Sequence, residues 1–152
     1  MFFNKKLNRN VLVEIVQKFD LRNKENKDNT DNKQVLYELL LNLENVLNKV
    51  NLKDDDRFFT YCRRDYLRKE FIDKLNKKHI ETNSDYLIDA YYNLYDYITN
   101  DTWISLASIP EGINAKEVIR KDEEYKKSGI ICNQEKQILL EMIQELKVAI
   151  KK

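Results

Sequence analysis

Leucines at helical spacing form the clearest pattern in the chain. The row steps by four, three, four and three residues and consists of Leu36, Leu40, Leu43, Leu47 and Val50. These steps bring all five side chains to one side of an α-helix. The pattern predicts a helix starting near Asp31 that buries the row in a bundle core or, over residues 36–50, in the seam of a homo-oligomer. Two heptads are too short to indicate a long coiled coil.

Weaker apolar periodicities and helix end signals predict five further helices. Asparagine or serine stands near the start of each of the last three, which suits an N-cap. Ser128 and Gly129 follow the usual pattern of a helix C-terminus. The predicted segments span residues 11–19, 54–78, 84–99, 114–128 and 133–150.

The segment 54–78 carries two apolar rows instead of one. Phe59, Cys62 and Tyr66 point one way, whereas the row that begins at Leu67 and continues through Phe71 is rotated by roughly a quarter-turn or more at about 100° per residue. We expect this helix either to bend or to contact different partners on two sides. Both alternatives place it centrally.

Two segments lack helical periodicity. Residues 22–33 contain no apolar side chain and predict a polar loop, and residues 102–112 predict an extended or short-helical connector covered by the core. The 152 residues include only two glycines and one proline, and no Asn-Gly or Asp-Gly pair, so hairpin turns are scarce. The sequence therefore predicts an all-α fold: one compact domain over 1–152, a bundle of about five to six helices with an irregular connector near 100–113.

The helix predicted from residue 84 separates a buried stripe from an acidic face. Leu87, Tyr91, Leu94 and Ile98 fall within about 60° of one another, which predicts the buried side. On the opposite side Asp85, Asp89 and Asp96 fall within roughly 40° of one another. Tyr92 flanks them on one side and Tyr86 and Tyr97 on the other. The run 85–99 contains no lysine or arginine.

Carboxylates edged by tyrosines are typical of a protein interface, because Asp accepts charge-assisted hydrogen bonds and Tyr supplies contact area at low entropic cost. The alternative is an acidic surface whose charge is balanced by a neighbouring basic helix. A base-stacking platform would need positive charge beside the rings, so we reject that interpretation. The residues predicted to contact a partner protein are Asp85, Tyr86, Asp89, Tyr92, Asp96, Tyr97 and Asp101.

Arginines on the segment 54–78 support a second hypothesis. Arg57, Arg64 and Arg68 share a helix face and could contact phosphates. Against this, 27 basic and 26 acidic residues leave a net charge of only +1, and three aspartates precede Arg57. Nucleic-acid binding is therefore the alternative rather than the leading hypothesis.

Motifs of catalysis and of metal or cofactor binding are missing from the sequence. His79 is the single histidine, and Cys62 and Cys132 do not show zinc-site or disulfide-framework spacing. The two glycines are isolated, and no nucleophile motif is present. We therefore expect no enzymatic activity, no cofactor and no metal. Reduced thiols and the lack of an 18-residue apolar run indicate a cytoplasmic protein without a membrane span.

In composition the chain resembles small helical inhibitors, a resemblance carried by its aspartates and tyrosines and by no specific motif. Bacterial immunity proteins, which neutralise a cognate toxin, and phage-encoded inhibitors of host nucleases have this general character. The resemblance implies stoichiometric binding to a protein. A nuclease toxin is typically basic because it must approach phosphates, so its cations would suit the acidic face.

Overall fold

The computed structural model describes residues 7–20, 29–52, 57–82, 85–100 and 104–150. For residues 29–31, 57–58, 60 and 81–82 it describes the backbone alone. The helices are α1 (Arg9–Lys18), α2 (Asn29–Asn48), α3 (Arg57–Glu70), α4 (Lys77–Thr82), α5 (Asp85–Thr99), α6 (Ala115–Ser128) and α7 (Asn133–Ile150). Among the described residues, two 3₁₀ helices are η2 (Ile72–Lys74) and η3 (Leu106–Ser108).

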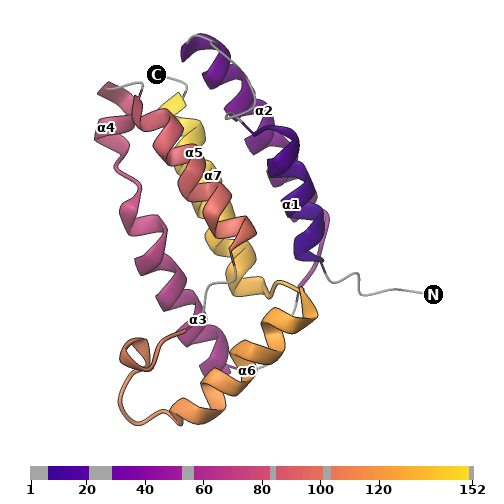
Figure 1. Ribbon diagram of the computed structural model, residues 1–152, viewed down its shortest axis with the longest axis vertical. Coiled ribbons are helices and arrows are strands. Elements are labelled where there is room, and N and C mark those ends of the chain that lie inside the picture. Colours follow the sequence, from indigo (N-terminus) through magenta and orange to yellow (C-terminus); the bar gives the residue numbers. More distant parts are fainter. Residues whose placement is uncertain (1–6, 21–28, 53–56, 83–84, 101–103, 151–152) are drawn as a thin grey trace, which may run out of the picture.

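The prediction of an all-α helical bundle is confirmed. Within the described ranges no strand is present, and an isolated antiparallel bridge joins Asn8 to Ile130. Helix α7 packs against α2, α3 and α4, whereas α5 packs against α1, α2 and α4. Figure 1 shows α5 in front of α7, α1 and α2 along one side, and α6 across the lower end of the bundle. This arrangement leaves one side of α5 facing outward.

The leucine row of α2 lies in the core of the bundle. Leu36, Leu40, Leu43 and Leu47 are at most 1% exposed and belong to one large cluster with the apolar stripes of α5 and α7. Burying a leucine fully contributes roughly 1.5–3 kcal/mol, so this row is a main source of stability. Of the two predicted roles, bundle core and dimer seam, these four leucines therefore fill the first within the folded chain.

The predicted helix 54–78 is broken after Glu70. Residues 72–74 tighten into η2, and Leu75 takes an extended conformation with φ −76° and ψ 111° before α4 begins. The two apolar rows contact different clusters. Leu67 and Phe71 join the main core, whereas Phe59 and Cys62 join a small second cluster. The expectation of two packing partners is confirmed, whereas the single helix expected to bend is divided into α3, η2 and α4.

The ends of other segments differ from prediction in small ways. Helix α2 begins at Asn29, so residues 29–33 of the predicted polar loop are helical, and residues 21–28 lie outside the described part. The connector is only partly covered. Ile104 is buried, but η3 turns Leu106 outward to 67% exposure.

The predicted boundaries of α6 are confirmed. The Asn114 side chain accepts a hydrogen bond from the Glu117 N–H, and Gly129 closes the helix with φ 67° in the left-handed region that glycine favours. Asn133, predicted as the N-cap of the last helix, is instead the first helical residue of α7. The predicted N-cap of α5, residues 83–84, is not described.

Candidate functional site

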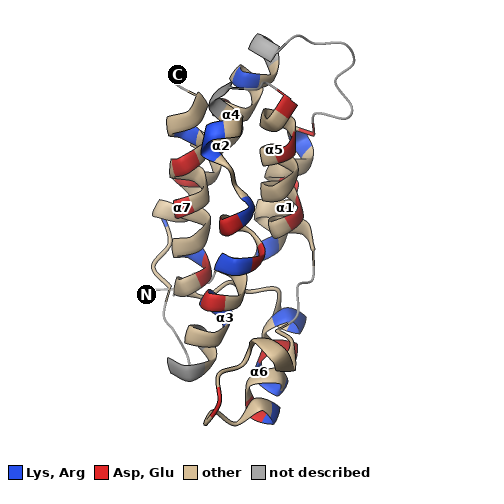
Figure 2. Ribbon diagram, turned by 90° about the vertical axis from the view of Figure 1, so that its left-hand side faces the viewer, with Lys and Arg blue, Asp and Glu red and all other residues tan. Residues whose placement is uncertain are grey.

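The outer face of α5 carries the acidic side chains that the sequence predicted to be exposed. Asp85, Asp89 and Asp96 are all exposed. Helix α5 begins with Asp85, whose negative charge is stabilised by the positive end of the helix dipole. Figure 2 shows acidic positions along α5 on the outside of the bundle. We call Asp85, Asp89 and Asp96 together the α5 acidic face.

The chain does not neutralise this face with its own cations at two of the three positions. In the described part of the chain, neither Asp89 nor Asp96 has an ion pair with lysine, arginine or histidine. The alternative interpretation, an acidic surface balanced by a neighbouring basic helix, gains no support from a direct ion pair at these two positions. Two solvated carboxylates therefore remain available to a cationic ligand.

The tyrosines beside the acidic face differ in exposure. Tyr86 is 37% exposed, and its ring lies against the imidazole of His79 with centroids 4.6 Å apart. Tyr92 is half-buried and packs edge-on against Tyr91 at 5.0 Å. Rings held in this way present a surface without losing much further freedom on binding.

Tyr97 was predicted to contact a partner, and this prediction is wrong. Its side chain is 2% exposed and packs edge-on against Phe71, with ring centroids 4.7 Å apart. At about 100° per residue Tyr97 falls only about 20° from Ala90, which is also buried, so the buried stripe of α5 is wider than the pattern of leucines suggested. Asp101 lies outside the described residues.

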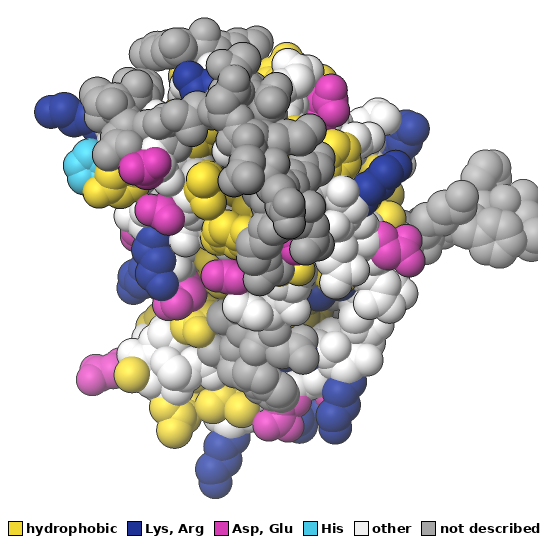
Figure 3. Space-filling view, turned by 45° about the horizontal axis from the view of Figure 1, so that its top comes forward, with side chains coloured by type: hydrophobic (Ala, Val, Ile, Leu, Met, Phe, Trp, Pro, Cys, Tyr) yellow, Lys and Arg dark blue, Asp and Glu magenta, His cyan; other side chains and the backbone are white. Residues whose placement is uncertain are grey.

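His79 lies within α4 instead of just beyond a helix end as the sequence suggested. The residue is exposed, and Figure 3 shows its imidazole in cyan at the rim of the molecule beside hydrophobic side-chain surface. Within the described residues, no group of three or more His, Cys, Asp or Glu side chains is arranged to hold a metal ion. His79 therefore contributes a ring contact at the edge of the α5 acidic face.

Basic residues of α3, η2 and α4 lie beside acidic partners. Arg68 pairs with Glu141 of α7, Lys69 with Asp65 at 3.1 Å, Lys74 with Glu70 at 2.9 Å, and Lys77 with Glu145 at 3.4 Å. Arg64 is exposed, and the side chain of Arg57 is not described. Paired cations offer less net positive charge to a phosphate backbone, so this arrangement does not favour the nucleic-acid alternative.

A buried ionic cluster joins α1, α3, α5, α6 and α7. Arg63, 2% exposed, donates to Asp122 at 2.9 Å, and the second carboxylate oxygen of Asp122 accepts from the Ile104 N–H at 2.9 Å. Arg9 and the Tyr125 hydroxyl both donate to the fully buried Glu135. Each carboxylate thus has charged and neutral donors, as buried acids require.

The cluster also holds the C-terminal end of α5. A guanidinium nitrogen of Arg9 donates to the carbonyl oxygens of Tyr97 and Ile98, each at 3.1 Å. These carbonyls belong to the last turn of a helix, which lacks intrahelical donors and is stabilised by a cation. The orientation of α5 is therefore fixed from inside the bundle.

Burial and charge shift the ionisation of the cluster. Burial alone would lower the pKa of the Arg9 and Arg63 guanidinium groups, but Glu135, joined by Asp122 at Arg63, outweighs it and raises both pKa values. Burial, reinforced by Glu135, raises the pKa of Tyr97 and Tyr125 well above the ordinary value of 10.0. The arginines stay charged and the phenols neutral.

These phenols predict a loss of stability in alkali. A folded-state pKa raised above the unfolded value stabilises the fold below pH 10, and the contribution falls as pH rises above 10, at up to about 1.4 kcal/mol per pH unit for each group. Between pH 10 and 11, the free energy of unfolding measured in urea should decline less steeply for Tyr97→Phe than for wild type. Tyr61→Phe, which alters a solvent-exposed ring, is the control. Equal slopes for Tyr97→Phe and wild type would contradict this prediction.

The apolar periodicities did not predict the ionic cluster, although the sequence contains a pattern that indicates it. Arg63 follows Phe59 by four residues and precedes Leu67 by four, and Asp122 follows Val118 by four, so each charge lies on an apolar stripe. A charged residue at a stripe position indicates a buried partner.

Comparisons with protein-family models, curated proteins and solved structures find no match to this chain. Function must therefore be argued from the α5 acidic face and the geometry around it. In the described part of the chain, no helix combines the length and apolar character needed to cross a membrane.

Proposed function

We propose that this chain is a stoichiometric protein-binding inhibitor of the immunity-protein kind, which neutralises a cationic toxin, such as a nuclease, through the α5 acidic face. The observation that carries the proposal is the exposure of Asp89 and Asp96 without an ion pair in the described part of the chain. Asp85 extends the same face by one turn, and Tyr86 and Tyr92 lie at its edges.

The proposed mechanism has an electrostatic step and a contact step. Exposed carboxylates attract a basic partner over about one Debye length, roughly 8 Å at physiological salt, and raise the association rate. On contact, the carboxylates accept hydrogen bonds from arginine or lysine, and the tyrosine rings exclude water around those bonds. Inhibition follows if the bound cations are those that the toxin uses to approach phosphates.

A rigid support favours this mechanism. Tyr91 at the centre of α5 is buried and donates to the Val16 carbonyl at 3.1 Å, and Arg9 holds the C-terminal carbonyls of the helix. Preorganised side chains lose less freedom on binding, which improves affinity. Helix α5 is therefore suited to present its carboxylates in one fixed arrangement.

Charge reversal of the face tests the proposal. An Asp89→Lys/Asp96→Lys bait should capture at least roughly tenfold less of a basic partner protein from cells of the source than wild-type bait does, because attraction becomes repulsion. The matched control is Asp73→Lys/Glu123→Lys, which changes the net charge equally at two exposed positions elsewhere. Quantitative mass spectrometry of the captured proteins measures the difference, and circular dichroism checks that all three baits fold.

Three outcomes count against the proposal. The reversed bait retains every specifically captured protein, or the control bait loses them equally, or the proteins lost on reversal are not basic. Salt-dependent binding of DNA or RNA that falls with Arg64 and Arg68 replaced would instead support the nucleic-acid alternative.

A further inference from the structure

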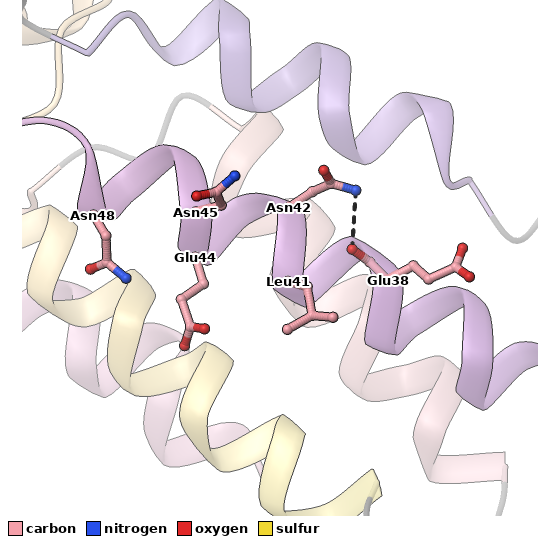
Figure 4. Close-up of a pocket in the computed structure, with 6 residues that line it drawn as sticks. All are labelled: Glu38, Leu41, Asn42, Glu44, Asn45 and Asn48. Atoms are coloured by element: carbon pink, nitrogen blue, oxygen red, sulfur yellow. Dashed lines mark hydrogen bonds between the residues drawn. The ribbon is translucent and has the colours of Figure 1, made fainter.

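The outer face of α2 is a second polar surface, separate from the α5 acidic face. The leucine row of α2 points into the core, and the remaining side of the helix points outward between α1 and α7 (Figure 4). A shallow groove runs over this side and is lined by Glu38, Leu41, Asn42, Glu44, Asn45 and Asn48. Leu41 is 41% exposed, although it lies in the middle of the helix.

Four exposed residues of this face follow the spacing of a helix-pairing seam. Glu38, Asn42 and Asn45 of α2 and Lys49, the turn residue directly after its end, step by four, three and four residues and are all exposed. At about 100° per residue the three helical members fall within about 60° of one another, and the Lys49 N–H donates to the Val46 carbonyl at 3.3 Å in the turn that closes the helix. The same spacing brings the a and d positions of a coiled coil to one line. Helix α2 thus has a leucine line inside the bundle and an amide-centred line outside it.

The polar groups of this line are available for contacts outside the chain. Asn42 donates its side-chain N–H to the Glu38 carbonyl oxygen at 3.1 Å, which leaves its own side-chain oxygen free to accept (Figure 4). Glu38 accepts from Gln34 at 3.2 Å. Within the described part of the chain neither Glu38 nor Lys49 forms an ion pair, whereas Glu44 at the edge pairs with Lys147 at 3.0 Å.

We propose that this face binds a second copy of the same chain, with the two α2 helices antiparallel and a twofold axis between Asn42 and Asn45. In this register Asn42 of each copy lies opposite Asn45 of the other. Glu38 of each copy lies opposite Lys49 of the other. The interface then contains two reciprocal amide pairs in its centre and two ion pairs at its ends.

The order of charges along α2 supports a second copy of the chain as the partner at this surface. A twofold interface uses the same patch on both subunits, so the patch must be complementary to itself. The α2 line has an acid at one end, amides in the middle and a base at the other end, and reversing its direction satisfies this condition. A parallel alignment would instead place like charges together. Asparagines in a seam reduce stability but fix the register, so a reversible dimer of small interface is expected.

This proposal does not depend on the proposed inhibitor function. The α5 acidic face belongs to another helix and contains none of the four residues of the α2 line. Reversal of Asp89 and Asp96 should leave dimer formation unchanged, and changes on α2 should leave capture of a basic partner unchanged. The two proposals therefore fail separately.

Sedimentation equilibrium of the full chain between 10 and 500 µM tests the dimer, the concentrations being of the order at which small interfaces associate. Wild type should show a reversible monomer–dimer equilibrium. Glu38→Lys alone and Lys49→Glu alone should each weaken association on the order of tenfold, because two ion pairs become two like-charge contacts. The double variant Glu38→Lys/Lys49→Glu should return the dissociation constant to within about threefold of wild type.

The control is Glu123→Lys, which changes an exposed acid on α6 and should leave association at the wild-type level. A wild-type chain that stays monomeric throughout the range overturns the proposal. Association that single reversals do not weaken, or that the double variant does not restore, overturns it as well, since both results exclude the antiparallel register.

Discussion

Replacement of Arg63 by methionine is expected to lower the free energy of unfolding by about 3–5 kcal/mol. Arg63 is a buried cation of the ionic cluster, and Asp122, itself fully buried, would lose its hydrogen-bonded charged partner and keep the Lys126 ammonium, 3.8 Å away. Methionine has a similar volume, so most of the loss would come from the poorly compensated carboxylate and little of it from a cavity. Urea unfolding at pH 7 measures the change.

Two further variants separate charge from packing at this position. Arg64→Met alters the exposed neighbouring arginine and should change stability by less than about 0.5 kcal/mol. Arg63→Met/Asp122→Asn removes both charges but keeps an oxygen for the Ile104 N–H, so it should be more stable than Arg63→Met alone. An Arg63→Met protein as stable as wild type would contradict this prediction, because it would show that Lys126 compensates the Asp122 carboxylate without Arg63.

Glu135→Leu is expected to cost about 3 kcal/mol, near the lower end of the range for breaking a buried pair. Glu135 accepts from Arg9 and from the Tyr125 hydroxyl and is fully buried, but the Arg9 side chain is 15% exposed and can reach water after the change. Since Arg9 also holds the last turn of α5, amide hydrogen exchange at the C-terminal end of α5 should accelerate.

Glu141→Leu is the matched control for this variant. Glu141 pairs with Arg68, and both side chains are more than a third exposed, so the loss should stay below about 1 kcal/mol. Equal losses for Glu135→Leu and Glu141→Leu would contradict a special role for the buried carboxylate.

The fold could be predicted from sequence wherever one apolar line dominated a helix. The leucine row of α2 and the stripe of α7 are buried as periodicity indicated, and Asn114 and Gly129 bound α6 as local chemistry indicated. The break after Glu70 was foreseen only as a bend. Its position depends on which cluster each apolar row contacts, and this is decided by tertiary packing.

The candidate site could be predicted only in part, for a related reason. Exposure of Asp85, Asp89 and Asp96 follows from the direction of one helix, which the apolar stripe fixes. Tyr97 could not be placed in the same way, because its burial depends on Phe71 from a distant segment. The pairing of Arg63 with Asp122, 59 residues apart, likewise depends on how α3 and α6 pack.

The buried ionic cluster and the α5 acidic face differ in how their carboxylates are paired. Inside the bundle, carboxylates of α6 and α7 are matched by Arg63 and Arg9. On the outer side of α5, Asp89 and Asp96 have no such cations in the described part of the chain. Carboxylates are thus paired with arginines inside the bundle but lack such pairs on the outer side of α5. Cations of a partner protein could form the missing pairs there.

Association kinetics with the captured basic partner test this claim most directly. If the α5 acidic face attracts this partner, the association rate constant of wild type should fall between 50 mM and 300 mM salt. At 50 mM salt, the constant of Asp89→Lys/Asp96→Lys should be at least roughly tenfold lower than that of wild type. The control Asp73→Lys/Glu123→Lys should stay within about threefold of wild type. Equal rate constants for wild type and the α5 variant at low salt would contradict the account.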